Sequence, residues 1–309
     1  MQAEFSTYKN RPAVVVTTAA FRAVFLPQDG SKMASLLSLA AQRELLLVKG
    51  GESYRTLTYD GNYVQSECSA FDDMCPTIDP YTPSSGAYQG ITYPDHGEAC
   101  RLPYDVTVED GSVTFTAQSR LFPLTYVKRV TEGEKGAIVL SYQIINAGSE
   151  PFPFVWAGHV MLQGEDGMQI VTPYEDNAPS QMVFATAGYD ASALSRTTLT
   201  GFVPEKGAAY KFYYTQKIPQ GWFSAKYPSG DELRFSYDEK KVPYLGVWFN
   251  NGEFQNIYNV APELCTLPFD APHKAEQMGY TAKTDPTATI PANQTYQFEI
   301  EISFRRKTI

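Results

Sequence analysis

The chain contains few of the residues on which several kinds of site depend. Of its 309 residues only three are histidine and four are cysteine. Cys68 and Cys75 are seven positions apart, while Cys100 and Cys265 stand alone, so no Cys-x-x-Cys pair is present to bind zinc. We therefore expect no metal ion and no other cofactor, and we expect the thiols to be reduced.

Positive charge and long apolar runs are also scarce. The 25 Lys and Arg against 34 Asp and Glu give a formal net charge of −9. This argues against a nucleic-acid partner, because such partners are bound by clustered basic residues. No run approaches the roughly 18 apolar residues that span a bilayer, and the N-terminus lacks the basic and apolar segments of a signal peptide. We expect a cytoplasmic protein with no membrane partner.

Aromatic and turn-forming residues, by contrast, are abundant. Aromatics make up 14% of the chain, and 21 Pro and 22 Gly are spread through it. Aromatic residues favour pleated, half-buried surfaces, and dispersed Pro and Gly favour many strands and turns over helices. Short alternating or apolar segments bounded by turn residues predict strands at residues 32–39, 43–48, 113–117, 137–145, 233–237, 245–249 and 296–304.

The organisation indicated by this pattern is a single domain. No low-complexity linker divides residues 1–309, so we predict an all-β fold, one large antiparallel β-sandwich with few short helices. Asn250-Asn251-Gly252 predicts a hairpin turn, because both asparagines tolerate positive φ. Residues 77–93, rich in Pro, Ser, Gly and Tyr, predict a long loop of the kind that is usually functional or mobile.

One carboxylate and two imidazoles stand in distinctive settings. Glu263 follows a strand-like run and is predicted to lie in a Pro-punctuated loop, His159 lies on an apolar run, and His96 lies in Tyr-Pro-Asp-His-Gly-Glu. Histidine titrates near 6.5, and a glutamate near 4.3 is raised by burial among aromatics. Together they suit the movement of protons at the anomeric centre of a sugar.

Further residues near these groups are candidates for binding a sugar. Asp72 and Asp73 could contact its hydroxyls, and Phe71, Trp156 and Trp248 could stack on a pyranose face. Each has an ordinary alternative, because adjacent aspartates often form solvated turns and sandwich cores also use large aromatic residues. The third histidine, His273, is expected at the surface.

The order of several segments resembles the aldose 1-epimerases (galactose mutarotases) and their relatives, the hexose-6-phosphate epimerases. Nearly the full length of the chain takes part, through residues 25–36, 43–46, 71–78, 96–97, 156–159, 258–266 and 290–294. The chain departs from this pattern in two places. Pro262 precedes Glu263 where the family usually places proline after the glutamate, and no arginine stands shortly before His96.

The resemblance implies a β-supersandwich with a sugar site in a groove across one sheet. It implies that Glu263 takes the proton of the anomeric hydroxyl, that His159 protonates the ring oxygen and that His96 is a second donor. The ring then opens to the aldehyde and closes as the other anomer, with no cofactor. The activity expected is therefore the interconversion of the α and β anomers of a hexose or related aldose, by a monomer or a homodimer.

Two alternatives remain open on the same fold. A hexose-6-phosphate epimerase would need basic residues to hold the phosphate, and Arg101, Arg120, Lys128 and Arg129 are candidates. A non-catalytic carbohydrate-binding protein is favoured by the position of Pro262 and by the missing arginine. A glycoside hydrolase ranks last, because it needs two carboxylates at a defined separation and only Glu263 stands out.

Overall fold

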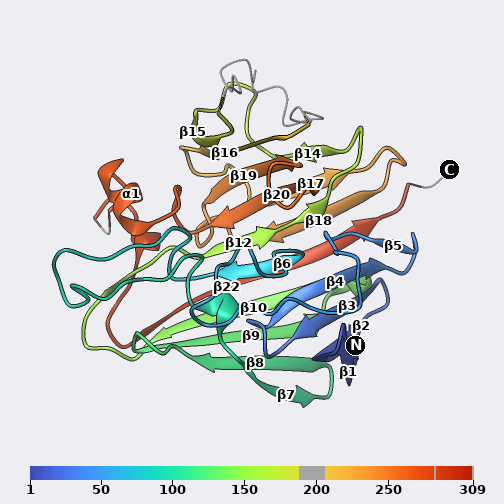
Figure 1. Ribbon diagram of the computed structural model, residues 1–309, viewed down its shortest axis with the longest axis horizontal. Helices are drawn as coiled ribbons and strands as arrows, with labels where there is room; N and C mark the ends of the chain where they lie inside the picture. The colour runs from blue at the N-terminus through green and yellow to red at the C-terminus, as the bar shows by residue number, and fades with distance from the viewer. Residues whose placement is uncertain (188–205, 282, 308–309) are drawn as a thin grey trace.

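The described chain, residues 1–187, 206–281 and 283–307 of a computed structural model, forms two large antiparallel sheets (Figure 1). Within these ranges the first sheet has twelve strands, in the order β1 (Gln2–Tyr8), β2 (Arg11–Thr17), β3 (Phe21–Leu26), β4 (Lys32–Ser38), β6 (Phe71–Met74), β12 (Ala157–Val160), β20 (Tyr258–Cys265), β19 (Tyr244–Asn251), β16 (Ala208–Tyr214) and β15 (Ser180–Ala185), with β5 (Arg43–Glu44) beside β4 and β13 (Leu162–Gln163) beside β20.

The second sheet covers one face of the first. Its eight strands run in the order β14 (Gln169–Val171), β17 (Trp222–Lys226), β18 (Glu232–Tyr237), β22 (Gln294–Arg305), β10 (Ile138–Asn146), β9 (Leu124–Glu132), β8 (Ser112–Gln118) and β7 (Asp105–Glu109). A small ladder joins β11 (Phe152–Pro153) to β21 (Thr289–Ile290). The helices in the part of the chain that the structure describes are α1 (Pro272–Gln277) and the 3₁₀ turns η1 (Ala99–Arg101), η2 (Glu134–Gly136) and η5 (Pro286–Ala288). The predicted sandwich with few short helices is confirmed.

The core lies between the two sheets and consists largely of aromatic and branched side chains. Phe71 of β6 packs against Phe235 of β18, with ring centroids 6.3 Å apart, and Trp156 packs against Phe298 of β22 at 4.5 Å. Because successive side chains of a strand point to opposite faces, the alternate residues of β6, β12, β20, β19 and β16 point away from this core. The outer face of the first sheet is therefore available for a site.

Most of the predicted strands coincide with observed ones, but the prediction for residues 43–48 is wrong beyond Glu44. There the backbone changes partner: Leu45 N–H still bonds Leu36 O of β4, whereas Leu47 N–H bonds Met161 O, and Leu46 forms an isolated bridge to Leu162. The segment thus joins two parts of the sheet instead of extending β5.

The predicted hairpin joins β19 and β20, but its turn lies further along the chain. Asn250 and Asn251 still pair with β20, and the chain reverses at residues 253–256. The Asn250 side chain explains the longer turn, because its Oδ1 accepts the Phe254 N–H and its Nδ2 donates to the Phe254 carbonyl, both at 3.0 Å. An amide that closes a turn in this way replaces the two-residue turn that the sequence suggested.

Glu263 lies within strand β20 and not in a loop, which corrects the prediction for that segment. On the edge of β20 that faces β12 and β13, the hydrogen-bonded ladder is interrupted beside Glu263. Residues 263–265 of β20 pair with β12 and residues 259 and 260 pair with β13, while Ala261 and Pro262 pair with neither. Proline has no N–H to give to a ladder. Pro262 is therefore accommodated between two short partner strands.

Two further features concern the protein as a whole. All four cysteines are free thiols. None of the helices in the described part of the chain has the length and apolar character needed to cross a bilayer.

Candidate active site

The register of the first sheet places one row of residues across five adjacent strands. Asp72 of β6 is opposite His159 of β12, which is opposite Glu263 of β20; Glu263 is opposite Gly246 of β19, which is opposite Tyr213 of β16. Directly opposed residues share a face of a sheet. Three segments far apart in the sequence thereby bring an acid, an imidazole and a second acid side by side on the outer face.

A pocket of about 310 Å³ lies over this row. Glu263, His159 and His96 all line it, so the structure brings together the three groups that the sequence singled out. Lys211 and Asp270, which the sequence analysis did not select, line the same pocket. The next row of the sheet, in which Lys211 is opposite Trp248, forms part of its floor.

The Glu263 carboxylate is fully buried, and its two oxygens differ in their nearest described neighbours. Its Oε2 is 2.7 Å from the Lys211 ammonium, while its Oε1 is 3.5 Å from His159 Nε2. Oε1 accepts no hydrogen bond from any residue that the structure describes. Burial raises the pKa of Glu263, and the nearby Lys211 opposes this rise only in part. A carboxylate with a raised pKa and an unpartnered oxygen in a pocket is suited to accept a proton from a bound molecule.

Lys211 is held between two carboxylates. Its Nζ is 2.6 Å from Asp270 Oδ1, and the Tyr213 hydroxyl donates to the same oxygen at 2.7 Å. Burial alone would lower the pKa of Lys211, but Asp270 and Glu263 outweigh it and the pKa is raised. Lys211 is therefore a permanent cation. Its signal in the sequence was a single lysine within the otherwise apolar strand Ala-Ala-Tyr-Lys-Phe-Tyr-Tyr.

The surroundings of His159 favour its neutral form. Burial, and then the charge of Lys211, lower its pKa well below the usual value. Its Nδ1 has no hydrogen-bond partner among the described residues. Its ring meets that of Tyr63 edge-on, with the centroids 6.3 Å apart.

His96 reaches the pocket from a loop and not from the sheet. Its backbone has a φ of 58°, and its ring stacks on Tyr63 with centroids 3.9 Å apart. Tyr63 is fixed in turn by a 2.9 Å hydrogen bond from its hydroxyl to Asp72. The residue after His96 must be glycine, because the φ of Gly97 is 71° and a Cβ there would lie 2.3 Å from the Cys75 carbonyl oxygen. The stacked Tyr63 ring and the tightly packed backbone at Gly97 thus set the position of the imidazole.

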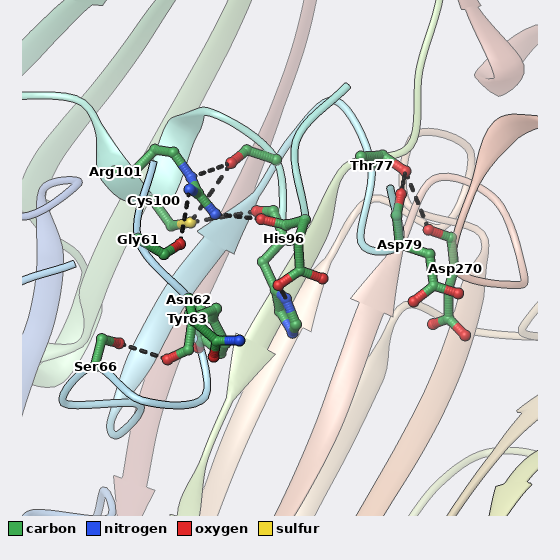
Figure 2. A network of polar contacts seen from close by, with 12 residues as sticks. Gly61, Asn62, Tyr63, Ser66, Thr77, Asp79, His96, Cys100, Arg101 and Asp270 are labelled. Carbon is green, nitrogen blue, oxygen red and sulfur yellow. Dashed lines mark hydrogen bonds and ion pairs between the residues drawn. The ribbon is translucent and has the colours of Figure 1, made fainter. Parts of the chain in front are cut away.

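Arg101 supports this loop from behind (Figure 2). Its guanidinium donates to the backbone carbonyls of Gly97 at 2.8 Å and Tyr59 at 2.5 Å, and also to those of Gly61 and Asp95. Arg101 is buried and does not line the pocket. Its role in the structure is to connect the segment around Tyr63 to the segment around His96.

Of the predicted sugar-binding residues, only Trp248 lines the pocket. It forms an aromatic wall with Phe184, at a centroid distance of 5.5 Å, and with Phe254, at 5.2 Å. Asp72 belongs to the central row but lies beneath Tyr63, where it also binds Lys32 at 2.9 Å. Asp72 therefore supports a wall of the pocket and does not face into it.

Asp73, Phe71 and Trp156 are placed on the opposite face of the sheet. Phe71 and Asp73 alternate with Asp72, and Trp156 is three residues before His159, so strand geometry directs all three into the core. Asp73 is paired there with Lys128 of β9, at 2.5 Å. The structure does not bring these three residues to the pocket, because each belongs to the packing between the two sheets.

The predicted loop at residues 77–93 helps to close one end of the pocket, together with α1. Ile78 and Asp79 line the pocket, and Lys274 of α1 binds Asp79. His273 stacks on Tyr81 at 4.8 Å and is only partly exposed. In Figure 1, α1 and this teal loop lie at the same end of the strands. No group of three or more His, Cys, Asp or Glu in the described ranges could hold a metal ion.

The fold is that of the galactose mutarotase-like proteins. A galactose mutarotase-like protein from Clostridium acetobutylicum superposes with a TM-score of 0.67 at 9% identity, covering 99% of each chain. One from Lactobacillus casei has a TM-score of 0.62 at 18% identity, covering 95% of this chain and 100% of its own. A candidate aldose 1-epimerase from Escherichia coli K12 has a TM-score of 0.67 at 11% identity, covering 95% and 98%. Neither a family model nor a curated protein sequence matches the chain.

Proposed function

We propose that the protein is an aldose 1-epimerase, which interconverts the α and β anomers of a hexose or related aldose. The observation that carries the proposal is the fully buried Glu263, whose Oε1 accepts no hydrogen bond from a described residue and which shares a pocket with His159 and His96. Solved structures with the same fold include proteins described as mutarotase-like, which supports the assignment.

In the proposed reaction Glu263 Oε1 accepts the proton of the anomeric hydroxyl. As the C1–O1 bond becomes a carbonyl, the C1–O5 bond breaks, and the ring oxygen takes a proton from the protonated (imidazolium) form of His159, with His96 as a second hydrogen-bond donor. Rotation about C1–C2 presents the other face of the aldehyde to O5. Ring closure then returns one proton from Glu263 to O1 and the other from O5 to His159, so no proton or electron is gained or lost.

The direct test is the rate of mutarotation followed by polarimetry or by NMR exchange. Freshly dissolved α-glucose and α-galactose are expected to reach equilibrium faster with the protein than without it. If the sugars bind but every rate across a broad panel equals the spontaneous one, the protein is a carbohydrate-binding protein and the proposed activity is refuted.

Trp248→Ala is expected to raise KM for the sugar by on the order of tenfold, because the indole offers an apolar face against which a pyranose can stack. The effect on kcat should be smaller, since Trp248 lies one row away from the row of Glu263. Trp222→Ala is the matched control: that tryptophan is also partly exposed but lies on β17 of the second sheet. Steady-state kinetics of both variants provides the measurement. A KM of Trp248→Ala equal to that of the wild type would exclude Trp248 from the binding site.

One observation favours a second candidate, the epimerisation of a phosphorylated hexose. Lys49 and Arg55 both donate to the side-chain oxygen of Gln255, a residue that lines the pocket. Lys49 makes no ion pair with any described residue, and its pKa is lowered to about 8 by burial and by the neighbouring Arg55. Two cations that share a neutral amide could hold a phosphate.

The four basic residues expected for this role do not meet at the pocket. Arg101 binds backbone carbonyls and Lys128 lies inside the sandwich. Arg120 stacks on Tyr59, and Arg129 points outward from β9. None of the four lines the pocket. Lys49 and Arg55 do not line it either, but both contact Gln255, which does, and they are the cations to which the second candidate assigns the phosphate.

The two candidates make opposite predictions for Lys49→Met and Arg55→Met. If the substrate carries a phosphate, each variant should raise KM for hexose 6-phosphate about tenfold or more and leave KM for the free hexose unchanged. Inorganic phosphate should then compete, and both effects should weaken as salt is added. If the wild-type protein shows no preference for phosphorylated over free hexoses, the second candidate is eliminated.

A further inference from the structure

Lys211 is placed to act on both the base and the substrate. Its ammonium lies 2.7 Å from Glu263 Oε2 and 2.6 Å from Asp270 Oδ1, and its side chain lines the same pocket as the free Oε1. Lysine carries three N–H donors. Two of them are directed to these carboxylates, which leaves one for a molecule in the pocket.

The charges of the groups that line the pocket show why this third N–H donor matters. Burial and the charge of Lys211 lower the pKa of His159, which favours the neutral imidazole. A neutral imidazole carries no positive charge with which to oppose the negative charge that develops on a ring oxygen as C1–O5 breaks. Lys211, buried and cationic in contact with Glu263, does carry such a charge, and electrostatic stabilisation is strongest in a pocket that excludes water.

We propose that Lys211 is a further catalytic residue, which keeps Glu263 ionised through Oε2 and donates its third N–H to the ring oxygen of the sugar during ring opening. The inference rests on the proposed function. Lys211 keeps its own proton throughout: Glu263 still receives the proton of the anomeric hydroxyl, and O5 still receives its proton from the protonated form of His159. The ammonium only stabilises the charge on O5 between bond breaking and protonation.

Asp270 and Tyr213 complete this arrangement as positioning residues. Asp270 Oδ1 accepts a hydrogen bond from the ammonium, and the Tyr213 hydroxyl donates to the same oxygen. Figure 2 shows Asp270 beside Thr77, whose hydroxyl contacts the Asp270 carbonyl at 3.2 Å. Tyr213 can lie where it does because Gly246 has no side chain; a Cβ there would be 2.6 Å from the ring.

Lys211→Met tests the proposal through two independent readouts. We expect kcat for mutarotation to fall about a hundredfold or more, the effect of removing one charged donor from a developing oxyanion. Removing the cation also raises the pKa of Glu263, so the acidic limb of the pH–rate profile should move to higher pH, by about one unit or more. Lys211→Arg keeps the charge and should leave that limb near its wild-type position.

The second readout needs no catalysis. In protein labelled with ¹³C at the Glu carboxyls, the Glu263 signal, assigned by its loss in Glu263→Gln, should titrate at higher pH in Lys211→Met than in the wild-type protein. Lys217→Met is the control: that lysine is exposed, pairs with Asp285 at 3.1 Å and does not line the pocket.

Either of two results for a folded Lys211→Met protein would overturn the proposal: a Glu263 titration that coincides with that of the wild type, or a kcat within threefold of the wild type. If the wild-type protein itself fails to accelerate mutarotation, the proposed function is refuted, and with it the contact to a ring oxygen. The NMR titration then still decides whether Lys211 controls the ionisation of Glu263.

Discussion

Glu263→Gln is expected to lower kcat for mutarotation by about a thousandfold, within the range that a positioned general base contributes. Glutamine has nearly the same shape as glutamate but cannot accept the proton of the anomeric hydroxyl. The variant should fold, because Lys211 keeps its second partner, Asp270, at 2.6 Å. Polarimetry at neutral pH provides the measurement, and a circular-dichroism spectrum establishes that the fold is intact.

The proposed function also predicts the pH dependence of the wild-type protein, through the same carboxylate. In the proposed mechanism Glu263 must be ionised to accept a proton, and burial raises its pKa. The rate should therefore fall as the pH drops through a value above the ordinary glutamate range. Glu253→Gln, at an exposed position of the β19–β20 hairpin, is the control and should leave both rate and profile unchanged. Full activity in Glu263→Gln would remove Glu263 from the mechanism.

The sandwich was predictable because its signals are local. Alternation in Tyr296–Phe304 and in Leu233–Tyr237 marks strands with one buried face, and both segments lie within observed strands, β22 and β18. Turn residues predicted the position of a turn less reliably. Asn250 carries the expected turn propensity but uses its side chain to close a longer loop, an outcome that depends on the Phe254 backbone and not on the local motif.

The face on which a residue lies could not be predicted with the same success. Asp72 and Asp73 are adjacent and chemically identical, yet one supports the pocket and the other lies in the core. A shift of one residue in a strand reverses its face, and only the pairing of β6 with β12 fixes this choice. The same rule separates Trp156 in the core from His159 in the pocket.

Residues whose role depends on long-range contacts were missed. Lys211 and Glu263 are 52 positions apart in numbering, and β19 lies between their strands in the sheet. No motif links them, and a single lysine in an aromatic strand carries no ligand signal until the carboxylates of Glu263 and Asp270 are placed beside it. Predicting the site in full therefore required the strand order of the first sheet.

The buried pair of Asp73 and Lys128 gives the second large effect, this time on stability. Lys128→Met should lower the free energy of unfolding by about 3–5 kcal/mol at neutral pH, because it leaves Asp73 charged and unpaired between the sheets. Lys128 also donates to the Ser31 carbonyl at 2.8 Å, and this hydrogen bond is lost as well. Urea denaturation of the wild type and of the variant provides the comparison.

The sign of the pH dependence follows from the pKa of Asp73, which burial raises even with Lys128 present. Loss of the cation raises it further. A carboxyl group whose pKa is higher in the folded than in the unfolded state costs stability above its unfolded pKa, so the deficit of Lys128→Met should shrink as the pH is lowered towards that value.

Replacing both partners, Asp73→Leu with Lys128→Met, should recover most of the loss, because no buried charge remains. Lys226→Met, exposed on β17, should change stability little; a similar small effect of Lys128→Met would show that Asp73 is not held as an unpaired charge in the core.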